Sequence, residues 1–361
     1  DTYLGRASTY RKMAEFESAL ADLTTAIELQ PQNDSFYFWR GRVYQDIDAY
    51  DDAVDDFNKA IELKPNYSYN YQSRGVNYSH MGEHTKALAD FSHAIELQPD
   101  NANNYSLRGF TYYDMGHYQQ ALADLNQSIT LNPEDSGNYR KRGDCYYEMG
   151  DFDAAIEEYT QAISYQPEFN AYYNLRGLTL LTTGRLDDAL ADLNRTLEIQ
   201  PENTLNYYWR GVILVRMGRY DDAMADMHKS EELDADDALT KAMCAFWRGV
   251  IHRLRGEDGS NEFELVDAVT PELDDEKMRL RTAALMLLWR GEVDAARAKY
   301  ETVLSGNVMT HQVFSPRLYL RQLTILFPER TEFGEISTWF EERVAENIVI
   351  IEAETSSTTE E

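Results

Sequence analysis

Cysteine is nearly absent from this sequence: only Cys145 and Cys244 occur, far apart in the chain. Neither belongs to a Cys-x-x-Cys pair, and two such residues offer no disulfide framework. Both fall in stretches with helical hydrophobic spacing, so we expect small, buried thiols. Long apolar runs are absent as well, and no segment approaches the roughly 20 apolar residues that a membrane-spanning helix requires.

Positive charge is scarce relative to negative charge. Lysine and arginine total 34 against 63 aspartates and glutamates, which gives a formal net charge of −29. A nucleic-acid-binding protein needs a basic face to neutralise phosphates, so this balance argues against nucleic acid as a partner. It suits a basic peptide or a cationic surface better, although the acids can equally form a solvated outer face.

Motifs that carry chemistry are missing too. The sequence contains no Walker A loop, GxGxxG, GxSxG or HExxH. His80 and His84 are separated by Gly82, so they need not share a helical face, and the alternating acids of residues 258–264 lack the glycine of an EF-hand. We therefore expect no enzyme, no metal site and no cofactor.

The positive signal is a strict period of 34 residues. Glycines and alanines repeat at this interval, and so do six prolines: Pro31, Pro65, Pro99, Pro133, Pro167 and Pro201. Such regular self-similarity is typical of a solenoid, in which each unit packs only on its neighbours.

Each unit predicts two helices. In residues 34–67, apolar side chains recur every three or four positions on both sides of a short break. Later units carry a glycine in this break, as at Gly82, suited to a left-handed turn. Small residues such as Gly41 and Ala53 are predicted to let the two helices approach closely. The predicted N-caps of the second helices are Asp51, Thr85, Asp153, Asp187 and Asp221.

The pattern Y-x3-G-x2-Y-x3-G-x4-A-x3-F-x2-A-x4-P resembles the tetratricopeptide repeat family, here in seven units: 1–33, 34–67, 68–101, 102–135, 136–169, 170–203 and 204–237. The resemblance implies an all-α, right-handed superhelical solenoid whose first helices line a concave groove. Beyond residue 237 the period loosens. We interpret residues 238–306 as degenerate repeats, 307–351 as a helical capping region and 352–361 as an acidic, Ser/Thr-rich tail.

A ladder of charges departs from the common family pattern. Each of the seven units has an arginine at the same repeat position, before the first glycine in all but the first unit, and an acid sixteen residues later: Arg6 and Asp22, Arg40 and Asp56, Arg74 and Asp90, Arg108 and Asp124, Arg142 and Glu158, Arg176 and Asp192, Arg210 and Asp226. An arginine inside a helix interface requires a carboxylate to compensate its charge. We therefore predict that these residues form repeated structural ion pairs and not a ligand-binding site. A tyrosine ladder that begins with Tyr3 and Tyr37 is predicted to serve packing.

The groove is the surface on which the units differ. The family's groove positions, carried over unit by unit, give as candidate peptide contacts Phe38, Arg42, Tyr69, Gln72, Phe110, Tyr113, Arg140, Tyr147, Leu178, Leu181, Tyr208, Val212 and Arg216. The lining is mixed at its start and apolar over residues 170–217. An exposed apolar lining indicates a bound segment, unless the chain's own capping region covers it.

Two functions follow from this reading. The first is a non-enzymatic scaffold that binds a peptide or helix in the groove. The second is a structural subunit whose copies assemble head to tail into an oligomer or filament. The partner is then a protein segment or a further copy of the chain. The cytoplasm is the default compartment, although a start at Asp1 is compatible with export and a cleaved signal peptide.

Overall fold

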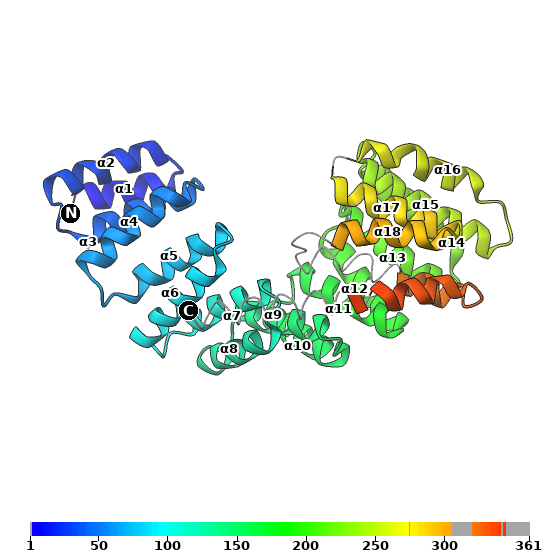
Figure 1. Ribbon diagram of the computed structural model, residues 1–361, viewed down its shortest axis with the longest axis horizontal. Helices are drawn as coiled ribbons and strands as arrows, with labels where there is room; N and C mark the ends of the chain where they lie inside the picture. Colours follow the sequence, from blue (N-terminus) through cyan, green and yellow to red (C-terminus); the bar gives the residue numbers. More distant parts are fainter. Residues whose placement is uncertain (1, 274, 305–319, 341, 344–361) are drawn as a thin grey trace. The chain divides into compact units, whose positions relative to one another are not determined.

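The computed structural model describes residues 2–304, 320–340 and 342–343, except residue 274, and every regular element in these ranges is a helix (Figure 1). The chain divides into two compact units, Asp1–Arg142 and Gly143–Glu361. In each unit, consecutive helices pack as pairs and each pair packs on the next, which makes the fold an all-α solenoid. None of the described helices is long and apolar enough to cross a membrane.

The unit Asp1–Arg142 contains four complete helix pairs. Its helices are α1 (Thr2–Lys12), α2 (Phe16–Leu29), α3 (Asp34–Asp46), α4 (Tyr50–Leu63), α5 (Ser68–His80), α6 (His84–Leu97), α7 (Ala102–Asp114) and α8 (Tyr118–Leu131), and α9 (Ser136–Glu148) crosses its boundary. Besides their partners, α1, α3, α5 and α7 contact one another in series. We call the surface that they share the first-helix face.

The unit Gly143–Glu361 continues the pairs and then closes them. Its helices are α10 (Phe152–Tyr165), α11 (Asn170–Thr183), α12 (Leu186–Ile199), α13 (Thr204–Arg216), α14 (Tyr220–Leu233), α15 (Ala238–Leu254), α16 (Ser260–Val269), the short η1 (Thr270–Glu272), α17 (Glu276–Trp289) and α18 (Val293–Leu304). Two further helical segments follow, residues 320–326 and 331–340, which we call the cap. The predicted tail 352–361 lies outside the described residues, as do parts of the predicted capping region.

Two kinds of glycine shape most of the helix pairs. Gly82 ends α5 with a φ of +75°, the left-handed conformation that glycine adopts without strain, so the predicted turn is confirmed. Gly75 lies where α5 and α6 cross, and a Cβ atom there would lie 2.8 Å from Cε1 of Phe91. A larger residue would therefore push the two helices apart.

The predicted N-caps of the second helices are wrong by two residues. Helix α4 begins at Tyr50, with Ala49 as its N-cap, because only one residue separates the left-handed turn residue from the helix. In α10 the cap is Asp151, whose side chain accepts a hydrogen bond from the N–H of Ala154 at 3.2 Å. The predicted residues Asp51, Thr85, Asp153, Asp187 and Asp221 all lie second in their helices. The aspartates still favour the helix dipole there.

The first two repeats lack the turn glycine, and this gives a stability prediction. Ala14 and Asp48 hold the position with φ of +57° and +59°, a conformation that costs a residue with a side chain about 1–2 kcal/mol. Ala14→Gly should therefore raise the free energy of unfolding by about 0.5–1 kcal/mol, after glycine's larger loss of entropy on folding. Urea denaturation followed by circular dichroism measures this change.

The matched control is Ala21→Gly, an exposed alanine inside α2. Glycine there should lower the free energy of unfolding by about 1 kcal/mol, because the backbone is already helical. If both substitutions destabilise the protein, the turn at Ala14 is not strained.

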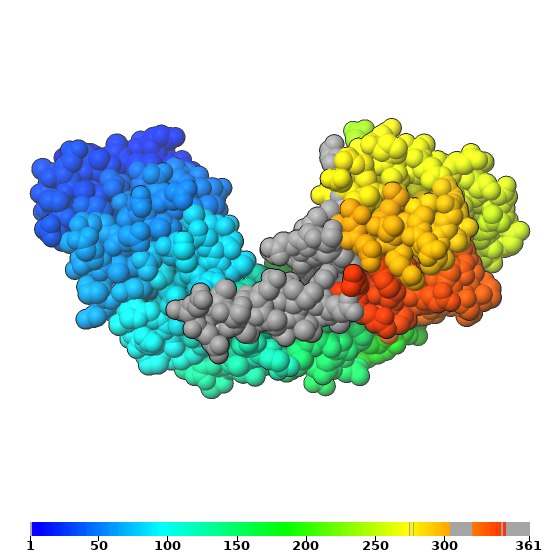
Figure 2. All heavy atoms as spheres, viewed as in Figure 1, coloured from blue at the N-terminus to red at the C-terminus, as the bar shows by residue number. Residues whose placement is uncertain are grey.

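The cap is part of the hydrophobic core of its unit. Leu320, Leu323 and Phe333 are fully buried in the same cluster as residues of α11, α13 and α15. The ring of Trp289, at the end of α17, lies 5.3 Å from that of Phe327 and 6.0 Å from that of Phe333, between centroids. In Figure 2 the cap, in orange-red, lies next to α18, in orange.

Candidate functional site

Five arginines of the charge ladder donate to the acids sixteen residues later. In these pairs Nε and Nη2 of the guanidinium reach both carboxylate oxygens, at distances between 2.6 and 2.8 Å: Arg40–Asp56, Arg74–Asp90, Arg108–Asp124, Arg176–Asp192 and Arg210–Asp226. Arg142 and Glu158 belong to different units. Bidentate geometry of this kind fixes the orientation of both side chains.

The third nitrogen of each arginine has a partner that the sequence reasoning missed. Nη1 donates to a hydroxyl or amide oxygen sixteen residues earlier, on the second helix of the preceding repeat. These acceptors lie at 2.6 to 3.3 Å and are Thr24, Asn58, Ser92, Asn126, Thr160 and Asn194. Their own 34-residue spacing could have revealed them. Arg40, Arg74, Arg108, Arg176 and Arg210 thus each tie three helices together.

The tyrosine ladder covers the same arginines. Cζ of Arg40 lies 5.9 Å from the ring centroid of Tyr37, and Cζ of Arg210 lies 5.4 Å from that of Tyr207. Burial raises the pKa of Asp56 in spite of its bonds to Arg40, whereas the bonds from the more exposed Arg6 lower the pKa of Asp22. The ladder arginines Arg40 and Arg210 therefore already contact a carboxylate and a tyrosine ring within the fold.

Most apolar groove candidates of the second unit are not open to a partner. Leu178, Leu181, Tyr208 and Val212 are buried, so the expectation of an exposed apolar lining is wrong for these residues, whereas Leu205 is 55% exposed. Two contacts of the capping region with this unit favour the alternative, coverage by the chain itself. Arg216 of α13 donates to the side-chain oxygen of Gln322, and Cζ of Arg321 lies 5.3 Å from the ring centroid of Phe152.

Two further groove candidates are also buried between helices. Gln72 is buried on α5 and donates to the side-chain oxygen of Asn104 at 2.6 Å. Tyr147 is buried and its ring lies 5.2 Å from that of Phe152, between centroids. Both side chains were expected to face a partner, and both instead link neighbouring helices.

The other candidates remain accessible on the unit Asp1–Arg142. Tyr69 is 41% exposed, and Phe38, Phe110, Tyr113 and Arg140 are half-buried. The ring of Tyr67 lies 6.3 Å from that of Phe38 and 5.5 Å from that of Tyr69. Nζ of Lys141 lies 4.1 Å from the ring centroid of Tyr113. The first-helix face therefore combines aromatic rings with positive charge.

Arg42 is the electrostatically unusual residue of this face. Among the described residues, the one carboxylate whose charge favours its guanidinium is Asp46, and both oxygens of Asp46 accept hydrogen bonds from Arg11 of α1. The side chain of Arg42 makes no hydrogen bond to the described part of the chain. Burial, and next the charge of Arg11, lowers the pKa of Arg42. An anion placed beside Arg42 would be stabilised.

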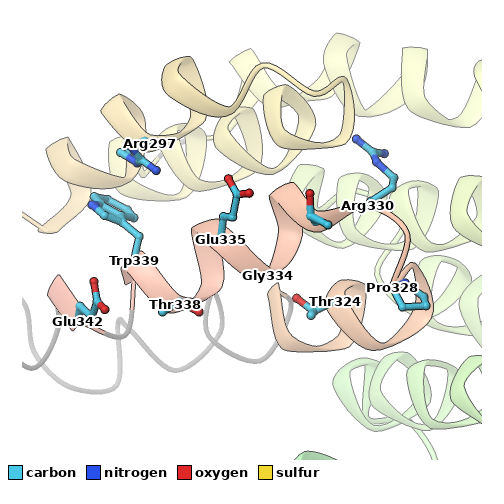
Figure 3. Close-up of a pocket in the computed structure, with 10 residues that line it drawn as sticks. Arg297, Thr324, Pro328, Arg330, Gly334, Glu335, Thr338, Trp339 and Glu342 are labelled. Carbon is cyan, nitrogen blue, oxygen red and sulfur yellow. The ribbon is translucent and has the colours of Figure 1, made fainter.

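A separate depression lies between α18 and the cap. Figure 3 shows Trp339 projecting from residues 331–340 toward Arg297, whose Cζ lies 5.5 Å from the indole centroid. Arg330, on the opposite wall, donates to Glu332 at 2.7 Å and to the carbonyl of Leu288 at 3.1 Å. These contacts hold the cap to α17 and α18, and we assign the depression no ligand.

Comparison with known proteins agrees with this architecture. Models of the tetratricopeptide repeat match residues 4–68, 75–116, 102–135, 140–204 and 206–237, together more than half of the chain. No curated protein sequence matches it.

Several solved structures are similar to this chain. The C-terminal part of a TPR repeat-containing protein from Cytophaga hutchinsonii has a TM-score of 0.56 and 17% identity, over 67% of this chain and 97% of its own. A tetratricopeptide repeat protein from Parabacteroides merdae has a TM-score of 0.52 and 18% identity, over 67% and 96%. A structure of MamA is 27% identical over 45% of this chain and 94% of its own, with a TM-score of 0.43. With its glycine turns, its paired helices and these family matches, the chain belongs to the tetratricopeptide repeat family, whose members are scaffolds for protein–protein interaction.

Proposed function

We propose that the chain is a non-enzymatic scaffold that binds a peptide on the first-helix face of the unit Asp1–Arg142. The observation that carries the proposal is Arg42, a half-buried guanidinium whose neighbouring carboxylate is already engaged by Arg11. A buried charge is favourable only when it is compensated, and an acidic side chain of a partner would compensate this one.

The surroundings of Arg42 favour a peptide over a free anion. Phe38, Tyr67 and Tyr69 form a cluster of rings that crosses from α3 to α5, and Tyr69 exposes a large apolar surface. Exposed aromatic side chains of this kind are typical anchors of protein interfaces. The partner that fits is a segment with an acidic residue between apolar ones, and not the basic peptide that the net charge alone favoured.

The observations behind self-assembly are weaker than the sequence suggested. That alternative depended on an apolar end of the groove that another copy could reach. In the second unit, Leu181 and Val212 of this end are buried in the same cluster as residues of the cap. We therefore do not propose a head-to-tail polymer.

Selection of displayed random peptides on the full chain tests the proposal. Selected peptides should be acidic and apolar, and calorimetry should show about tenfold weaker binding to Tyr69→Ala and to Arg42→Met. Leu131→Ala is the matched control, because Leu131 is 37% exposed but lies on α8, a second helix. Unchanged affinity in both face variants would mean that the peptide binds elsewhere.

A further inference from the structure

A cavity of about 280 Å³ lies in the unit Gly143–Glu361, where α13, α15 and α17 form its walls. Much of its lining is apolar and deeply buried, since Ala242 and Val266 are each 1% exposed and Phe246 is 2% exposed. The cavity belongs to the other unit than the first-helix face. An inference about it therefore does not depend on the proposed peptide site.

The lining offers no charge that would select an ionic ligand. Arg281 of α17 is its one charged residue among those described, and it already interacts with other groups of the chain, including Sδ of Met278, which accepts a hydrogen bond from Nη1 at 3.7 Å. No acidic residue belongs to the described lining, so a cation would lack a counter-charge. An anion would approach a chain with a formal net charge of −29. The cavity therefore fits an uncharged molecule.

A buried hydroxyl in the lining has no partner. Tyr300 of α18 is 2% exposed, and its hydroxyl makes no hydrogen bond to the described part of the chain. The ring of Tyr300 lies beside that of Phe340 in the cap, with 5.4 Å between the centroids. By contrast, the hydroxyl of Tyr208 in the same lining accepts a hydrogen bond from Nε1 of Trp247 at 2.8 Å. Because buried hydroxyls are normally hydrogen-bonded, the hydroxyl of Tyr300 is suited to pair with an oxygen of a ligand.

The volume of the cavity sets the size of that ligand. An apolar cavity of about 150 Å³ takes a molecule of the size of benzene, so 280 Å³ takes a molecule of about two fused rings. A peptide segment would bring backbone N–H and C=O groups that an apolar lining could not satisfy. A small molecule with a single oxygen brings only the group that the hydroxyl of Tyr300 can satisfy.

We propose that this cavity binds an uncharged, mainly apolar small molecule of about ten carbon atoms, whose single oxygen forms a hydrogen bond with the hydroxyl of Tyr300. The apolar body packs against Ala242, Phe246 and Val266. Burial of this body supplies the affinity, and the hydrogen bond selects the oxygen.

Calorimetry on the full chain tests the assignment with three probes of similar size: 2-naphthol, naphthalene and 2-naphthoate. 2-Naphthol should bind saturably and about tenfold or more tightly than 2-naphthoate, because the carboxylate would lose its water without gaining a counter-charge. Tyr300→Phe, which removes one oxygen, should weaken 2-naphthol binding severalfold. The same variant should leave naphthalene binding unchanged, because naphthalene has no oxygen to pair.

A second variant fills the cavity. Ala242 lines it and is 1% exposed, so Ala242→Leu should occupy part of the space and weaken the binding of both uncharged probes about tenfold. Ala235→Leu is the matched control. Ala235 is exposed in the turn before α15, so this change should leave the binding of both probes unaltered.

Three results would overturn the proposal. They are equal affinity for 2-naphthol and 2-naphthoate, an equal effect of Tyr300→Phe on 2-naphthol and naphthalene, and tighter binding of N-acetyl-leucinamide than of 2-naphthol. The last result would assign the cavity to an apolar side chain of a protein partner. If Tyr300→Phe fails to fold by circular dichroism, the probe comparison on the unaltered chain and the Ala242 variant still decide the outcome.

Discussion

Replacing Asp124 by leucine should lower the free energy of unfolding by about 3 kcal/mol, whereas the double change Arg108→Leu and Asp124→Leu should cost far less. The single change leaves the guanidinium of Arg108, whose side chain is 21% exposed, with Ser92 as its remaining side-chain hydrogen-bond partner. The double change removes both charges and leaves apolar side chains at a helix interface. Urea denaturation of the three proteins gives the comparison.

Glu62→Leu provides the matched control for the charge ladder. Glu62 is paired with Lys59, but its side chain is 68% exposed, so this change should cost less than about 1 kcal/mol. If Asp124→Leu and the double variant unfold at the same urea concentration, the arginine does not depend on its carboxylate. The ladder would then be a consequence of repetition and not a constraint on helix packing.

Leu323→Asp should detach the cap from its unit. Leu323 is fully buried in the cluster that contains Leu181 and Val212, and an unpaired carboxylate there should cost about 3–5 kcal/mol. We expect faster hydrogen exchange in residues 320–340 and new binding of a hydrophobic dye, because the apolar face of α11 and α13 becomes accessible.

The control for the cap is Ile325→Asp, two residues away on the same helix. Ile325 is 46% exposed, so a carboxylate there remains solvated and exchange should change little. Equal effects of the two substitutions would mean that the cap is held by something other than the burial of Leu323. Unchanged dye binding in Leu323→Asp would mean that the face beneath does not depend on the cap.

The repeats were predictable because each contact recurs every 34 residues. The glycine turn at Gly82 and the pairing of Arg108 with Asp124 follow from local chain geometry and from the cost of an unpaired charge. The helix starts were misplaced because the turn is tighter than an N-cap at Asp51 assumes. Asparagine and hydroxyl partners such as Asn58 were missed because their residue types vary from unit to unit.

The candidate site was less predictable, since it depends on contacts outside the repeat. Burial of Val212 involves residues 320–340, which follow after more than a hundred residues and keep no 34-residue register. The charge of Arg42 is poorly compensated because Arg11 already binds Asp46. The spacing of these residues in the sequence does not reveal that competition. A resemblance identifies groove positions, but only packing decides which of them stay open.

Photo-crosslinking of a selected peptide to the full chain tests the central claim most directly. A peptide with a crosslinking group beside its acidic residue would be irradiated on the protein, and the attached residues identified by mass spectrometry. We predict crosslinks confined to α1, α3, α5 and α7, around Arg42 and Tyr69, and lost when excess unlabelled peptide is added. Crosslinks on second-helix surfaces, or within Gly143–Glu361, would contradict a binding site on the first-helix face.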